Sequence, residues 1–440
     1  MKRLILHIGT HKTGTTSLQA FFLANAETLL EKEGIRFFEA REKYVGVKWP
    51  RNAHFLLRYA KAKTVPSSNR PDRKRATKIN LKAFKAEFPR YDTFLLSDER
   101  LWYEGTLHPD NWKIIKNLLD EMGFDCIDIV LYLRRQDLFI ASLWNQNMKA
   151  ATRVPDTLAE YASNSRATRV MNYDQGIAYL ENVFGKEHIR VRVYERGLLE
   201  KGDIRCDFCS LLGITLDEDY VFNEIESNPG LGPTVAQAKL VANNVETYRT
   251  TDNFLYYPAI EAALTSGNTK VPMVPQPLRK EILDRYADGN ARIAQEYLGK
   301  DDGELFDNAR ALDPDPQLDP MEFAVDMERM LVAALAKEHK KRLATEIRLK
   351  QQGKRIKQLE KQVKQLDKRL EKTESRTDGL NASLGPIARL RRKIWRKRQA
   401  AAKKAAANKT AAKKSAAKKA TAKKAATKKA ATKKATAKKK

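Results

Sequence analysis

Short apolar runs alternate with longer amphipathic stretches over the first 310 residues. The apolar runs have the length and composition of buried strands, and they lie at 3–8, 35–38, 93–97, 126–133 and 188–194. Apolar residues at helical spacing lie between and after these runs, most clearly over 112–122, 139–149, 173–184, 235–246 and 277–298. Buried strands that alternate with helices predict an α/β fold, in which helices cover both faces of a central parallel sheet.

The pattern changes near residue 310, where acidic residues and prolines gather (DPDPQLDP). We therefore expect an α/β domain over 1–310, a helical segment over 311–382 and a basic low-complexity segment over 383–440. The helical segment carries a stripe of apolar residues at alternating steps of three and four, namely Ile356, Leu359, Val363, Leu366 and Leu370. The stripe fits a short coiled coil that joins copies of the chain into a homo-oligomer, and it equally fits a solvated single helix.

Charge is concentrated at the end of the chain. Residues 391–440 hold 22 Lys and Arg and no acid, so residues 1–390 carry only +6 of the net charge of +28. Lys pairs begin at 413, 418, 423, 428 and 433, and this Ala/Lys/Thr repeat resembles the tails of linker histones. Such a segment cannot bury a core, so we expect a disordered tail that binds polyanions such as nucleic acid or acidic polysaccharide.

Composition excludes three classes of protein. The apolar content suffices for a core, which excludes a wholly disordered chain. Three cysteines are too few for a disulfide framework, and no apolar run approaches the roughly 18 residues of a membrane span. We therefore expect a cytoplasmic protein without a transmembrane helix. Residues 383–398 could form a basic helix on an anionic membrane surface, and the tail could bind the nucleoid.

The segment GTHKTGTTS, from Gly9 to Ser17, follows the first strand and opens a helix. Backbone N–H groups in such a loop, together with the helix N-terminus, form a cradle for phosphate. Gly9 and Gly14 have the spacing of a P-loop, which predicts a P-loop-like, three-layer domain. However, Thr15 follows Gly14 where a nucleoside triphosphatase has its lysine, and the lysine lies inside the loop at Lys12.

A second phosphate site is predicted after the strand 126–133, in IVLYLRRQDLFIASLWNQ. Arg134 stands at the strand end, and Ser142 follows eight residues later, a little over two helical turns. Both side chains can therefore lie above the same sheet edge. A guanidinium binds a terminal phosphate well because its donors form a rigid fork that stays charged.

Together, HIGTHKTGTTSLQ and the Arg134/Ser142 pair resemble sulfotransferases that use 3′-phosphoadenosine 5′-phosphosulfate (PAPS). FLLSDERLW (94–102) resembles a Ser-x-Glu segment of the bacterial members, and the resemblance covers roughly residues 1–300. It implies a sulfotransferase that moves the sulfuryl group of PAPS to an acceptor hydroxyl, plausibly of a saccharide or a glycolipid head group. It also implies that Arg134 and Ser142 bind the 3′-phosphate, and that the rest of the cofactor site is Lys12, Thr13, Gly14, Thr15, Thr16 and Ser17.

In the implied reaction Lys12 neutralises charge on the bridging oxygen, and a general base takes the proton of the acceptor. The candidate bases are Glu99, just past the strand 93–97, and His54. His11 could also touch the sulfuryl group. The scheme needs no metal, and no acidic cluster has the spacing of metal ligands. The pair Cys206 and Cys209 has no second pair beside it, so we interpret it as packing on one helix face.

Two other functions remain open from the sequence. A P-loop nucleotide kinase would share the fold, although the missing lysine and the Arg134/Ser142 pair argue against it. A protein that binds nucleic acid or another polyanion through its tail would use the α/β domain only as a tether.

Overall fold

A computed structural model of the chain divides into two compact units, Met1–Lys340 and Lys341–Lys440. The structure describes residues 1–400 except 46, 48–50, 66–69, 151, 224–229, 246–252, 254, 266–272, 309–310, 312, 316–319, 381–384, 386–389 and 392. The side chains of 374–380 are also outside this description. The Ala/Lys/Thr repeat and most of the linker at 381–389 therefore lie outside the described residues.

The first unit is built on five parallel strands in the order β2-β3-β1-β4-β5. Their bounds are β1 Arg3–Gly9, β2 Ile35–Phe37, β3 Thr93–Ser97, β4 Cys126–Leu133 and β5 Ile189–Val193. Each strand lies within one residue of the run that predicted it, so the prediction of an α/β fold with a central parallel sheet is confirmed. β1 is the middle strand, between β3 and β4, and the chain leaves it toward β2 on one side and later returns to β4 on the other.

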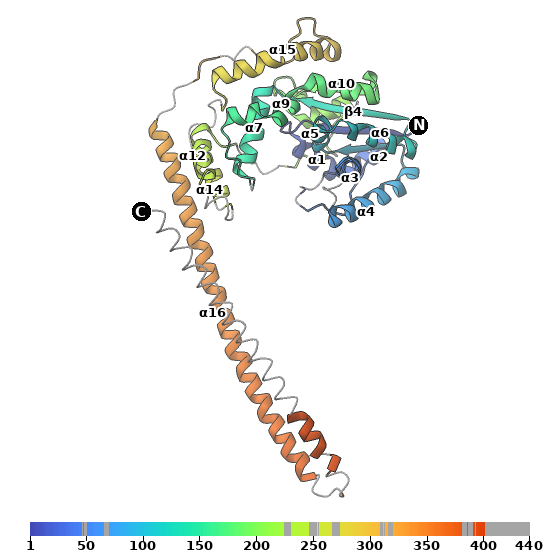
Figure 1. The fold of residues 1–440 in the computed structure, drawn as a ribbon. Coiled ribbons are helices and arrows are strands. Elements are labelled where there is room, and N and C mark those ends of the chain that lie inside the picture. Colours follow the sequence, from blue (N-terminus) through green and yellow to red (C-terminus); the bar gives the residue numbers. More distant parts are fainter. Residues whose placement is uncertain are drawn as a thin grey trace. The chain divides into compact units, whose positions relative to one another are not determined.

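Successive side chains of each strand face opposite sides of the sheet and pack into two separate cores. Ile5, Leu95, Val130 and Tyr132 pack on one face with side chains of α1, α2 and α11. The neighbouring positions in the same strands, such as Leu6, pack on the other face with α3, α5, α6, α7 and α10. The sheet and the helices on its two faces therefore form three layers, drawn in blue to green in Figure 1.

The helices of the first face are α1 Thr15–Ala24, α2 Ala26–Glu33 and α11 Ile204–Leu211. Those of the second face and its surroundings are α3 His54–Thr64, α4 Pro71–Glu87, α5 Arg100–Leu107, α6 Asp110–Met122, α7 Gln136–Lys149, α8 Leu158–Ser163, α9 Ser165–Met171, α10 Tyr173–Phe184, α12 Pro233–Asn243, α14 Tyr256–Thr265 and α15 Gln276–Leu298. Short 3₁₀ turns lie at Phe88–Arg90, Lys186–His188 and Glu200–Gly202.

An aromatic cluster fixes α4 to the second face of the sheet. The ring of Phe84 is fully buried, and its centroid lies 5.0 Å from that of Phe38 and 5.2 Å from that of Phe94 on β3. Truncating a buried Phe to Ala typically costs about 3–5 kcal/mol of stability. This cluster therefore contributes a substantial share of the free energy that holds α4 in place.

α16, Pro320–Leu380, is the long orange helix of Figure 1. Its first turns belong to the first unit: Met330 and Ala334 are buried, and the hydroxyl of Thr234 on α12 donates to Asp326 Oδ2 at 2.5 Å. In the second unit, the five apolar residues of the predicted seam are all exposed, with relative accessibilities of 45–61%. A helix is therefore present where a helical segment was predicted, whereas the coiled coil and the boundary near residue 310 stay predictions.

Among the described helices, none combines the length and the apolar character that crossing a membrane requires.

Candidate functional site

The loop between β1 and α1 lies at the carboxyl edge of the sheet. β3 and β2 lie on one side of β1, and β4 and β5 lie on the other, so the strand order reverses at β1. In open α/β sheets, ligands bind at the carboxyl ends of the strands where this reversal occurs. Gly9, Lys12 and Gly14 have positive φ angles of 98°, 66° and 71°. The loop is anchored to β4 because the N–H of Thr10 donates to the carbonyl of Tyr132 at 2.8 Å.

The loop ends at the N-terminus of α1, where no side chain caps the helix and an anion could bind the free N–H groups. Gly14 occupies the N-cap position, and no side chain caps the first turn formed by Thr15, Thr16 and Ser17. The N–H groups of a first helical turn have no partners within the helix, and together they attract negative charge. Thr15 is buried and Thr16 is exposed, while Thr13 is buried and donates its hydroxyl to the carbonyl of Thr10 at 2.7 Å.

Arg134 joins the end of β4 to this loop. Its Nη1 donates to the carbonyl oxygen of Lys12 at 2.9 Å, and its own carbonyl accepts the hydroxyl of Tyr173 at 2.7 Å. Burial lowers the pKa of Arg134, and within the described part of the chain no carboxylate forms an ion pair with it. Ser142 lies on the following helix, α7, and is half-buried; its hydroxyl makes no hydrogen bond among the described residues. Arg134 of the second predicted phosphate site is therefore in direct contact with the loop that was predicted as the first.

Glu99 stands directly against the start of the loop. A Cβ added to Gly9 would lie 2.7 Å from the Cβ of Glu99, so only glycine allows this approach. The carboxylate is almost fully buried, accepts from Gln19 Nε2 on α1 at 3.0 Å and forms an ion pair with Arg51. Burial raises the pKa of Glu99, although the charge of Arg51 opposes the shift. A carboxylate whose pKa is raised toward neutral pH is a better proton acceptor than an ordinary one.

His54 is engaged on both ring nitrogens. Nδ1 lies 2.7 Å from Asp98 Oδ2, and Nε2 lies 3.1 Å from Nε of Arg58, which donates to it. Burial lowers the pKa of His54, so the ring is neutral, with Nδ1–H donating to Asp98. The lone pair of Nε2 already accepts from Arg58. This geometry makes His54 a support for the loop that carries Asp98 and Glu99, and it leaves Glu99 the better placed of the two candidate bases.

His11, inside the loop, has a buried ring nitrogen without a partner among the described residues. Its Nδ1 is buried and has no hydrogen-bond partner among the described residues, and its ring packs edge-on against Tyr103 at 5.6 Å. Burial and the nearby cation of Arg51 lower the pKa of His11 to about 3, so the ring is neutral. A neutral imidazole here can accept or donate one hydrogen bond to a ligand that enters the loop.

Three further residues shape the site and were not predicted from the sequence. Arg51 reaches Glu99 because Asn52 fixes the preceding loop to β3, accepting from the N–H of Ser97 at 2.6 Å. Tyr194 and Ile204 crowd Gly14: a Cβ there would lie 3.2 Å from the Tyr194 ring and 3.0 Å from the Ile204 side chain. Tyr194 directly follows β5, and the position of a Tyr after a strand is the only signal that the sequence offers.

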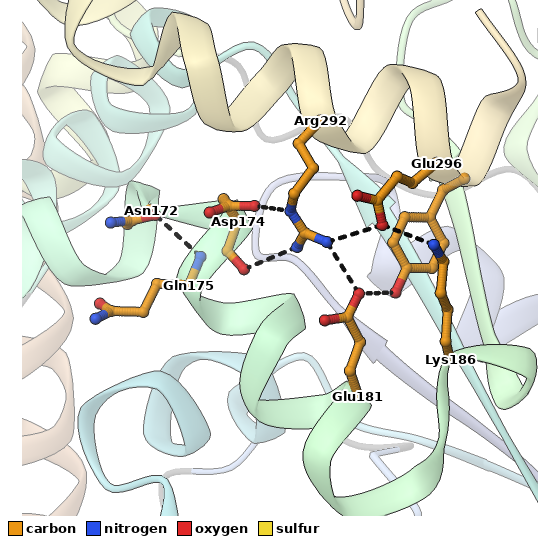
Figure 2. Close-up of polar contacts among 8 residues, drawn as sticks. Asn172, Asp174, Gln175, Glu181, Lys186, Arg292 and Glu296 are labelled. Atoms are coloured by element: carbon orange, nitrogen blue, oxygen red, sulfur yellow. Dashed lines mark hydrogen bonds and ion pairs between the residues drawn. The ribbon is translucent and has the colours of Figure 1, made fainter.

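A cavity of about 420 Å³ lies elsewhere, between α9, α10 and α15. Its residues are Thr168, Arg169, Asn172, Tyr173, Asp174, Gln175, Arg285, Tyr286, Gly289 and Asn290. Beside it, Arg292 of α15 bonds Asp174 of α10, and its Nη1 lies 3.1 Å from both Glu181 Oε1 and Glu296 Oε2 (Figure 2). This network holds α15 against α10. It thereby supports Tyr173 on α10, whose hydroxyl donates to the carbonyl of Arg134 at the end of β4.

Comparisons with known proteins give partial likenesses. No family model matches the chain. An uncharacterized protein of Archaeoglobus fulgidus is 24% identical over 172 residues, which are 39% of this chain and 46% of that protein. The chain therefore spans less than half the length of this relative.

Two solved structures share part of the architecture. One is a sulfotransferase from Alicyclobacillus acidocaldarius, with a TM-score of 0.38 and 12% identity over 68% of this chain and 97% of that one. The other is the sulfotransferase domain from the curacin biosynthetic pathway, with a TM-score of 0.32 and 10% identity over 52% and 81% of the two chains. Both scores are low, so the fold class rests on this chain's own strand order and layers.

Proposed function

We propose that this protein is a PAPS-dependent sulfotransferase that acts on a hydroxyl of a saccharide or of a glycolipid head group. The observation that carries the proposal is the hydrogen bond from Arg134 to the carbonyl of Lys12. It joins the loop to a guanidinium that forms no ion pair with a carboxylate among the described residues, and this supports the proposal of two adjacent phosphate sites. PAPS has two such groups, on its 3′ and 5′ positions, whereas ATP has no 3′-phosphate.

The residues present fit this co-substrate. The uncapped first turn of α1 and the loop N–H groups would hold the 5′-phosphate, and Arg134 with Ser142 would hold the 3′-phosphate. His11 Nδ1, which has no partner within the described residues, gives the ligand one more polar contact. A nucleotide kinase fits less well, because Thr15 stands where that class needs a lysine.

In the proposed reaction the acceptor oxygen attacks sulfur as the bond from sulfur to the bridging oxygen breaks. The leaving group is 3′,5′-adenosine bisphosphate, and the hydroxyl proton passes to Glu99. Lys12 would stabilise the negative charge that grows on the bridging oxygen. Arg51 keeps the Glu99 carboxylate oriented, while burial keeps its pKa raised.

The binding step is tested by calorimetric titration of the full chain with 3′,5′-adenosine bisphosphate and with ATP. We expect tight binding of the bisphosphate and weak binding of ATP, and Arg134→Ala should remove most of the difference. Arg190→Ala is the matched control, since Arg190 is an exposed arginine in β5 and its loss removes the same charge. A folded parent that binds neither nucleotide, or binds both alike, would rule out the assignment.

The basic tail supports a second, separate proposal. Its 22 Lys and Arg without an acid favour binding to nucleic acid or another polyanion, whatever the α/β domain does. Deleting residues 391–440 separates the two activities. Sulfuryl transfer that survives the deletion, with loss of polyanion binding alone, supports an accessory tail. Loss of transfer on deletion would contradict it.

A cytoplasmic location and a homo-oligomer through the stripe on α16 also stay predictions.

A further inference from the structure

A cluster of metal-binding side chains lies at the amino end of the sheet, opposite the edge that carries the loop. Cys126 and Asp128 are two residues apart in β4, so their side chains face the same side of the sheet. β5 pairs with β4 through Ile129 and Ile189, and His188 comes one residue earlier, beside Asp128. The register of two neighbouring strands therefore brings a thiol, a carboxylate and an imidazole together.

The spacing of these three groups fits a tetrahedral metal ion. Cys126 Sγ lies 3.8 Å from His188 Nδ1, which lies 3.6 Å from Asp128 Oδ1, and one ligand atom from each residue lies within 4.8 Å of the other two. Around tetrahedral Zn²⁺, bond lengths near 2.3 Å to sulfur and 2.0 Å to nitrogen or oxygen place ligand atoms about 3.3–3.6 Å apart. The two distances from His188 Nδ1 need to shorten by only a few tenths of an ångström, and the remaining distance, from sulfur to carboxylate oxygen, by at most about 1.3 Å.

Neighbouring charges already orient two of the ligands. Arg3 holds Asp128 through Oδ2 alone, with both Nε and Nη2 at 2.7 Å, and so leaves Oδ1 turned toward His188. Glu187 Oε1 lies 3.9 Å from Nε2, the other nitrogen of His188. A carboxylate behind a histidine ligand and a hydrogen bond to a carboxylate ligand are typical surroundings of a metal site.

We propose that Cys126, Asp128 and His188 bind a divalent transition metal of borderline softness, best represented by Zn²⁺, with water as the fourth ligand. Mixed sulfur, nitrogen and oxygen donors select this class over Mg²⁺ or Ca²⁺, which prefer oxygen alone. The metal would link β4 to the turn before β5 and stabilise the sheet at its amino edge. This inference does not depend on the proposed function, because the cluster lies at the other end of the strands.

Co²⁺ is the probe, since its spectrum reports both geometry and sulfur ligation. The full chain, stripped with a chelator, is titrated with Co²⁺ and then with Zn²⁺. We expect visible bands of tetrahedral Co²⁺ and a near-ultraviolet band from sulfur to Co²⁺, at one ion per chain, which Zn²⁺ abolishes. A parent chain without these bands would overturn the proposal.

Variants assign the bands to residues. Cys126→Ser should lose the near-ultraviolet band, and His188→Gln should lose tight binding. Cys206→Ser is the matched control, because Cys206 is likewise a half-buried free cysteine but lies on α11. Circular dichroism checks that each variant is folded. If Cys126→Ser does not fold, His188→Gln alone tests the site. A band that persists in both site variants, or disappears in the control, would refute the assignment.

Discussion

Gly9→Ala tests whether the loop and Glu99 form one unit. The new methyl group would lie 2.7 Å from the Cβ of Glu99 and 3.0 Å from its Cα, atoms that no side-chain rotation can move. An ordinary carbon contact needs about 3.5–4.0 Å, so the loop or the end of β3 must move by roughly 1 Å. We expect about 1–2 kcal/mol of destabilisation from the φ of 98° and about 1–3 kcal/mol more from the clash.

Gly34→Ala is the matched control for this substitution. Gly34 has a φ of 66° at the end of α2, and a Cβ there would meet nothing within 4 Å. It should therefore cost only about 1 kcal/mol, because the φ strain is partly offset by lower entropy of the unfolded chain. Nucleotide binding and sulfuryl transfer should be unchanged in the control.

The two variants are compared by denaturant unfolding and by titration with 3′,5′-adenosine bisphosphate. A displacement of 1 Å in a reactive site can cost about 10²-fold in rate, so we expect a loss of this order in transfer by Gly9→Ala. Equal stability of the two variants, or undiminished binding by Gly9→Ala, would refute the contact between Gly9 and Glu99 on which the site depends.

Three other substitutions test separate parts of the structure. Lys12→Ala should abolish sulfuryl transfer in a turnover assay. It should change stability by less than about 0.5 kcal/mol, because a loop side chain near the surface contributes little to packing. Continued transfer by this variant would exclude Lys12 as the group that stabilises the leaving oxygen. Glu99→Gln should lower turnover about 10²–10⁴-fold. In the parent, activity should fall as pH drops through the raised pKa of Glu99, at a higher pH than for an ordinary glutamate, and a flat profile would exclude Glu99 as the base. Lys239→Met tests a buried lysine whose pKa burial lowers to about 7. The unfolded chain takes up this proton near pH 10.4 and the folded chain only near 7, so parental stability should rise by about 2 kcal/mol from pH 7 to 9; the same slope in Lys239→Met would contradict this origin.

The strands could be predicted because each is an uninterrupted apolar run that is buried on both faces. β3 and β4 have the predicted bounds, 93–97 and 126–133. Their order could not be predicted, since the pairing of Arg3 with Thr93 joins residues ninety positions apart that share no local pattern. α4 was missed for the opposite reason: nearly half of its residues are charged, and only a few positions such as Phe84 are buried.

At the candidate site, local motifs predicted the loop and Arg134, and tertiary contacts added the residues around Glu99. Lys12 could be proposed because it lies in the loop three residues after β1, and Arg134 because it directly follows β4, at the edge where ligands bind in open α/β sheets. The partners of Glu99 come from elsewhere in the chain, Gln19 from α1 and Arg51 from a loop before α3. Gln19 ends the motif HIGTHKTGTTSLQ, whereas Arg51 belongs to no motif, and only the folded arrangement shows that both reach the Glu99 carboxylate.

Positive charge acts on two different scales in this chain. At the sheet edge, Arg134 and Arg51 are held in fixed, largely buried positions, where reduced screening would strengthen their interaction with the proposed nucleotide. In 391–440, many lysines and arginines would act together, and the proposed binding to a polyanion would weaken steeply as salt is added. Salt therefore separates the two activities: moderate ionic strength should release nucleic acid from the tail while a nucleotide stays bound at the loop.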